Sequence, residues 1–185
     1  GATSRVTTTL QLRAQITPGS YYVIGVADWN NAVAETTENN NTRYDGMLIG
    51  GDLQVSGLSA SGGGVANGPI NVTDTTVNQG APLPQSETAF YFSTNSTFDA
   101  SDVFLGSRSV PALGTSVPST ATTPLTVPAG TPVGTYWVIA VADRNLALAE
   151  SIESNNTRTY SFKVGPDLIV SSVTAPSSAA AGMTI

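Results

Sequence analysis

An acidic, asparagine-rich phrase occurs twice in this chain, as AVAETTENNNTR at residues 32–43 and as ALAESIESNNTR at residues 147–158. Carboxylate and amide oxygens gathered in one loop are the ligands that a hard cation such as Ca²⁺ prefers. In and just before the second phrase the candidate ligands are Asp143, Glu150, Glu153 and Asn155, followed by Asn156. In and just before the first phrase they are Asp28, Glu35, Glu38 and Asn40, followed by Asn41. One hypothesis is therefore a calcium loop, present twice, that would stiffen the junctions between units.

The same residues have a second interpretation as turn formers. Asn and Asp side chains bond to nearby backbone N–H groups and accept left-handed conformations, so a long hairpin connection needs several of them. The loop also lacks the D-x-[DN]-x-[DN]-G spacing of a dedicated calcium loop. This favours turn structure over metal binding, so we assign no metal ligand and keep calcium as the alternative.

Composition argues against an enzyme. The chain has no histidine and no cysteine, which removes the Ser-His-Asp and Cys-His pairs and the commonest transition-metal ligand. Glu150 and Glu153 could be imagined as a hydrolase's carboxylate pair, but no apolar cleft is indicated nearby to raise the pKa of one of them. We expect no catalytic residue and no cofactor.

Charge and hydropathy exclude two classes of partner. The net charge is −6, and one lysine with six scattered arginines cannot neutralise a run of phosphates or an anionic membrane surface. The longest apolar runs, such as residues 21–27, are about a third of the ~20 residues needed to span a bilayer. The expected partners are neighbouring repeats or copies of this chain, surface glycans, or host or cell-surface proteins, with no nucleic acid and no membrane insertion.

The two phrases belong to a longer internal repeat. A shift of 115 residues places residues 19–43 over 134–158 with 16 of 25 positions identical, and the same shift places residues 51–60 over 166–175. Residues 51–165 then form one complete unit, residues 1–50 the C-terminal part of a preceding unit, and residues 166–185 the first strands of a following one. The pattern predicts a window of a tandem array with a period of about 115 residues.

The complete unit reads as short strands between turns. Alternating or continuous apolar runs predict seven strands: residues 52–58, 70–80, 87–95, 103–110, 122–128, 135–143 and 158–164. The apolar parity slips between Val72 and Val77, which predicts a bulge there. Seven strands in about 115 residues without helical periodicity indicate an all-β fold, an immunoglobulin-like antiparallel β-sandwich.

Packing must stabilise such a unit, since it has no disulfide. The residues expected to tolerate change least are the large aromatic ones: Phe90, Phe92, Trp137, Tyr160 and Phe162. Tyr22 and Trp137 occupy equivalent positions and could instead share an outward face that stacks on sugars. Residues 1–50 supply about three strands, too few to close a sandwich, so something must cover their exposed edge.

Several phrases resemble one known family. PAGTPVGTYWVIAVAD at residues 128–143, AESIESNNTR at residues 149–158 and PDLIVSSVTAPSSAAAG at residues 166–182 are similar to CARDB, the cell-adhesion-related domain found in bacteria. The resemblance covers essentially the whole chain as a partial, a complete and a second partial copy. It implies immunoglobulin-like repeats of large surface and secreted proteins with adhesive or scaffolding roles, and it carries over no catalytic residue.

The expected function is a non-catalytic structural or adhesive module of a repetitive extracellular or cell-surface protein, forming a stalk, array or filament. Neighbouring copies could also exchange strands, with residues 167–175 as the lent strand. The alternative is a carbohydrate-binding or accessory module of a secreted enzyme, which would expose a flat aromatic strip.

Overall fold

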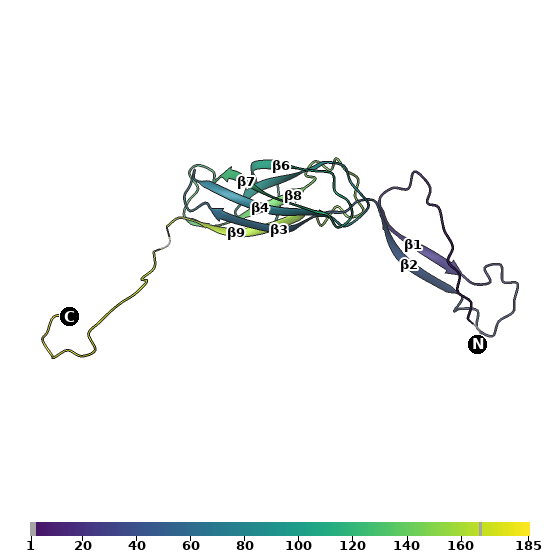
Figure 1. The fold of residues 1–185 in the computed structure, drawn as a ribbon, viewed down its shortest axis with the longest axis horizontal. Coiled ribbons are helices and arrows are strands. Elements are labelled where there is room, and N and C mark those ends of the chain that lie inside the picture. Colours follow the sequence, from purple (N-terminus) through teal and green to yellow (C-terminus); the bar gives the residue numbers. More distant parts are fainter. Residues whose placement is uncertain (1–2, 167) are drawn as a thin grey trace.

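The computed structural model describes residues 3–166 and 168–185 and contains only strands, turns and irregular segments there. Figure 1 shows an elongated β-sheet body, with the hairpin β1–β2 at one end and an extended tail at the other. The nine strands are β1 (Gly19–Val26), β2 (Thr42–Ile49), β3 (Leu53–Gly62), β4 (Pro69–Asn78), β5 (Ser86–Ser93), β6 (Val103–Val110), β7 (Pro118–Thr126), β8 (Gly134–Ala142) and β9 (Thr157–Val164).

The body is a sandwich of two antiparallel sheets. One sheet has the strand order β3-β4-β7 and the other β6-β5-β8-β9. The predicted immunoglobulin-like β-sandwich is confirmed, and each predicted strand overlaps an observed one. All seven strands fall within residues 51–165, whereas the assignment of the flanking segments to neighbouring repeats stays a prediction.

The core lies between the two sheets and draws on alternate residues of every strand. Leu53 and Val55 of β3 meet Phe90 of β5 and Val138 of β8 in one buried cluster. Phe92 stacks on Tyr136 with ring centroids 4.7 Å apart, and Phe162 contacts it edge-on. These contacts explain why apolar residues recur at every second position, since a sheet presents alternate side chains to its partner.

Two predictions about β9 and β4 are wrong. Tyr160, expected to pack in the interior, lies in the edge strand β9 and keeps 37% of its surface exposed. The expected bulge in β4 is absent: β4 runs in unbroken register with β7, and the irregularity lies in the neighbouring strand β3, between Val55 and Gly57. The parity slipped because Asp74 and Thr76 occupy inward positions that apolar residues usually fill.

The hairpin β1–β2 repeats the geometry of β8–β9. Gly19 pairs with Ile49 and Val26 with Thr42, just as Gly134 pairs with Val164 and Val141 with Thr157, so every pair is displaced by 115 residues. Residues 1–50 hold two strands in the described part, not the expected three. Residues 3–11 correspond to β7, and β7 needs β4 beside it, which the hairpin does not offer.

Candidate functional site

The loop between β8 and β9 opens with a turn built on one aspartate. Asp143 adopts a left-handed conformation with φ of 42°. Its Oδ1 accepts the backbone N–H of Ala147 at 3.2 Å and its Oδ2 accepts that of Leu148 at 2.8 Å. Both carboxylate oxygens are therefore occupied by the chain itself, which is how an aspartate fixes a tight turn.

The second half of the loop holds the beginning of β3. The Glu150 carboxylate accepts the backbone N–H of Leu53 through Oε2. Ser151 donates its N–H and its hydroxyl to the Gly51 carbonyl at 2.7 and 3.0 Å. The Asn155 amide donates to Asp52 Oδ1 at 2.7 Å. These contacts join segments about 100 residues apart in sequence, so the loop fixes the point where the chain enters the sandwich.

We call Glu150, Ser151, Asn155 and Asn156 the strand-docking site. Its parts are held together by the loop: Glu153 Oε1 accepts the Glu150 N–H at 3.1 Å, and Asn156 Nδ2 donates to Glu150 Oε1 at 3.2 Å. Among the described residues, the side-chain oxygens of Asn155 and Asn156 are buried without a hydrogen-bond partner. The site thus has spare acceptors beside a carboxylate.

Burial changes the chemistry of that carboxylate. Loss of solvent, together with the nearby charges of Glu153 and Asp143, raises the pKa of Glu150 to about 7. The Leu53 N–H and the Asn156 amide oppose this rise because they stabilise the ionised form. Near neutral pH the strand-docking site therefore holds a mixture of carboxylate and carboxylic acid.

The first acidic loop repeats the aspartate turn bonds and the bond between its two glutamates, but among the described residues it binds no other segment. Asp28 accepts the N–H groups of Ala32 and Val33, both at 2.9 Å, and Glu38 accepts the Glu35 N–H at 2.8 Å. Glu35 and Asn40, the counterparts of Glu150 and Asn155, are exposed. Within the described residues, no strand is docked against them.

The calcium hypothesis gains no support from this geometry. In the part of the chain that the structure describes, no three Asp or Glu side chains are arranged to hold a metal ion. The structure does bring Glu150, Asn155 and Asn156 together, and it adds Asp52, which the sequence reasoning missed. The available signal was the phrase D-L-x-V, present at residues 52–55 and again at 167–170.

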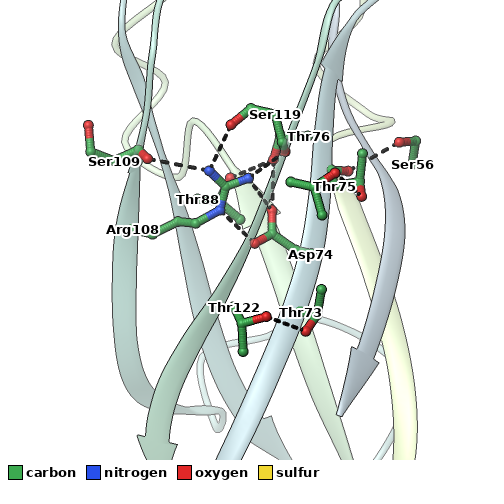
Figure 2. Close-up of polar contacts among 11 residues, drawn as sticks. Ser56, Thr73, Asp74, Thr75, Thr76, Thr88, Arg108, Ser109, Ser119 and Thr122 are labelled. Atoms are coloured by element: carbon green, nitrogen blue, oxygen red, sulfur yellow. Dashed lines mark hydrogen bonds and ion pairs between the residues drawn. The ribbon is translucent and has the colours of Figure 1, made fainter.

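A second buried polar cluster, also missed, joins the two sheets on the other side of the core (Figure 2). Arg108 of β6 pairs with the fully buried Asp74 of β4 through two bonds of 2.6 and 2.7 Å. Its remaining N–H groups reach Ser119 and the Ser109 carbonyl. The Thr76 and Thr88 hydroxyls complete the cluster, so the ion pair is fully satisfied and is a structural clamp.

The aromatic residues of the outer face pack on one another. Tyr91 lies 4.8 Å from Phe98 and 5.6 Å from Phe104 between ring centroids, and Arg144 stacks over both Tyr91 and Phe104. The expectation that Trp137 packs in the core is wrong, because Trp137 is half-buried against the same outer cluster and lies outside the core between the sheets. Tyr91 is buried by these contacts, whereas Phe98 and Phe104 stay partly exposed.

Comparison with known proteins agrees with the sequence pattern. The sequence model of the CARDB family matches residues 1–45, the segment that carries the first acidic loop. The resemblance to CARDB is confirmed there. A search of curated proteins finds no match to the chain.

The solved structures that are similar to this chain include CARDB domains. The crystal structure of a CARDB domain from Pyrococcus furiosus, described as a complex with di-metal ions, has a TM-score of 0.48 and 20% identity, covering 62% of this chain and 89% of that one. Beta-glucosidase 3B from Thermotoga neapolitana has a TM-score of 0.46 and 14% identity, covering 66% of this chain. The matched part is 17% of the glucosidase chain.

Proposed function

We propose that this chain is a non-catalytic structural or adhesive module of a large repetitive extracellular or cell-surface protein, forming a stalk, array or filament. The observation that carries the proposal is the placement of the two ends of the sandwich. The chain enters beside the acidic loop and leaves at the opposite end of the long axis, after β9 (Figure 1). Units joined in this way lie end to end, which suits a protein that spans distance.

The strand-docking site supports the same proposal. It fixes Gly51 to Leu53, the residues that follow directly on the preceding hairpin, with four hydrogen bonds from one loop. A loop that is anchored to the chain entry restricts bending at the junction between successive units. No helix in the described residues is long and apolar enough to cross a membrane.

Small-angle X-ray scattering tests this function. One, two and three copies of residues 50–165 are joined in series and compared. The maximum dimension is expected to increase by an equal step with each added copy, as for a rod. A dimension that barely grows, as for a compact globule, would refute an array-forming role. Antibody labelling of intact source cells tests the surface location, and labelling only after lysis would count against it.

The second candidate is a carbohydrate-binding accessory module, and the half-buried Trp137 on the outer face is the observation in its favour. Trp137→Ala separates the two functions. Binding to a glycan array that the wild-type protein shows and the folded variant lacks would favour the accessory module. We expect no glycan binding by either protein, because Trp137 packs against the outer cluster instead of standing free.

A further inference from the structure

The complete unit shows what the acidic loop and its hairpin bind. The bound segment has the sequence G-D-L-Q-V, of which Leu53 and Val55 enter the core against Tyr136, Val138 and Val164 of β8 and β9. The Leu53 N–H and the Gly51 carbonyl are taken by Glu150 and Ser151. Hairpin and loop together therefore form a binding site for one extended strand of defined sequence.

The N-terminal hairpin has the same site without an occupant among the described residues. Each residue of the strand-docking site has a counterpart 115 residues earlier: Glu35, Thr36, Asn40 and Asn41. Thr36 keeps the hydroxyl group of Ser151. The apolar positions are kept too, with Tyr21, Val23 and Ile49 in place of Tyr136, Val138 and Val164. Val23 is 42% exposed, whereas Val138 is fully buried.

The tail carries a sequence of the bound type. Residues 166–175, PDLIVSSVTA, match GDLQVSGLSA at residues 51–60 in five of ten positions, including the leucine and the valine that enter the core. Leu168 and Val170 are 93% and 82% exposed, and residues 168–185 form no strand. The proline at residue 166 keeps the carbonyl that the hydroxyl residue of the loop needs.

We propose that the N-terminal hairpin of one copy binds residues 166–175 of a second copy across its face, as β8 and β9 pack against β3, with the Leu168 N–H donated to the Glu35 carboxylate. The proposal rests on the proposed end-to-end function and identifies the partner as a second copy of this chain. Hairpin and tail lie at opposite ends of the sandwich (Figure 1), so one copy cannot close on itself. Each copy offers one hairpin and one tail, and such a head-to-tail contact extends as an open chain.

Residues 166–175 correspond to β3 alone, so the contact buries one strand and we expect the association to depend on concentration. Sedimentation velocity of the full chain is the measurement, with a weight-average sedimentation coefficient that increases over a hundredfold range of protein concentration. A coefficient that stays at the monomer value throughout would overturn the proposal.

A matched pair of tail variants tests the register. Leu168→Gln changes the residue that enters the hairpin, and Ile169→Gln changes its neighbour, which is 79% exposed and occupies the position of Gln54. Leu168→Gln is expected to weaken the association at least about tenfold, whereas Ile169→Gln leaves it unchanged. Equal effects, or association that persists in Leu168→Gln because two hairpins pack together, would contradict the proposed strand.

A second pair tests the carboxylate. Glu35→Ala removes the acceptor for the Leu168 N–H and is expected to weaken the association, whereas Glu35→Gln keeps an acceptor and restores it. Glu35 is exposed, so thermal unfolding of both variants should match the wild type. No difference between the two variants would remove Glu35 from the interface. The scattering test of the proposed function uses residues 50–165, which contain neither the N-terminal hairpin β1–β2 nor the tail. The two proposals can therefore fail separately.

Discussion

The hairpins β1–β2 and β8–β9 share their register, their turn bonds and most of their sequence, yet only the second is buried. Asp28 and Asp143 even have φ angles of 44° and 42°. Local sequence is therefore enough to form the strands and the acidic turn. Burial is added by β3 and the rest of the sandwich, which the first hairpin lacks. The comparison shows that the strands and the turn depend on local sequence, whereas burial of the hairpin depends on the other strands of the sandwich.

The largest expected effect comes from the clamp between the sheets, which the first hairpin does not possess. Arg108→Ala leaves Asp74 as an unpaired buried charge and should lower the free energy of unfolding by about 3–5 kcal/mol. Urea denaturation measures this. The double variant Asp74→Leu with Arg108→Met removes both charges and should unfold at higher urea than Arg108→Ala. A double variant less stable than the single one would contradict the burial argument.

Equivalent isoleucines give the most direct contrast between the hairpins. Ile139 is fully buried beside Tyr91, whereas Ile24, 115 residues earlier, is 61% exposed. Ile139→Ala should cost about 2–5 kcal/mol of unfolding free energy, and Ile24→Ala less than about 0.5 kcal/mol. Urea denaturation of each variant, compared with the wild type, measures both changes. Similar losses in the two variants would mean that the first hairpin is covered in solution.

Glu150 predicts an unusual dependence of stability on pH. Its pKa is about 7 in the folded chain and 4.5 in the reference state, so folding favours the protonated form. Its contribution is complete below about pH 4.5 and is lost as the pH rises through 7. Relative to Glu150→Gln, the wild type should lose about 1–3 kcal/mol between pH 5 and pH 8.

Glu150→Gln is a suitable reference because glutamine does not ionise and, like the protonated acid, keeps an acceptor for the Leu53 N–H. It also offers a donor to the unpartnered Asn156 oxygen once that amide rotates. Thermal unfolding from pH 5 to pH 8 measures the difference. Glu35→Gln is the control and should follow the wild-type profile, since Glu35 is exposed. Parallel profiles for wild type and Glu150→Gln would show that Glu150 ionises as freely in the fold as outside it.

The smallest expected effect is that of calcium. The carboxylates of Asp143 and Glu150 already accept backbone N–H groups, so a cation would have to displace them. Adding millimolar calcium and then a chelator should move the unfolding temperature by no more than about 1 °C. A rise of several degrees that the chelator reverses would turn either acidic loop into a metal site.

The strands could be predicted from sequence because each one alternates or is apolar throughout. The observed β6 has the predicted bounds, and β8 differs by one residue at each end. The clamp could not be predicted in this way. Asp74 and Thr76 point inward, and an apolar pattern misreads a polar inward residue as a break in the strand. The partner of Asp74 lies 34 residues away, and its position depends on the assembled sheets.

The sequence predicts the turn in the acidic loop but not the hydrogen bonds from this loop to β3. Asp143 bonds to residues four and five positions ahead, which a local pattern can indicate. Glu150 bonds to a residue 97 positions earlier, which it cannot. The one feature of the sequence that pointed to residues 52–55 was the recurrence of D-L-x-V at residues 167–170, at the same 115-residue offset as the acidic loops.

Residues 50–165 contain both sheets of the sandwich and its core, so we expect them to fold without residues 1–49 and 166–185. Residues 50–165 retain the Gly50 carbonyl, which accepts the Ala81 N–H at 2.8 Å. The free energy of unfolding of residues 50–165, compared with that of the full chain at a concentration where it is monomeric, tests the claim. We predict a cooperative transition whose free energy lies within about 0.5 kcal/mol of that of the full chain. A loss of more than about 2 kcal/mol, or no cooperative transition, would show that the flanking segments belong to the same folded unit.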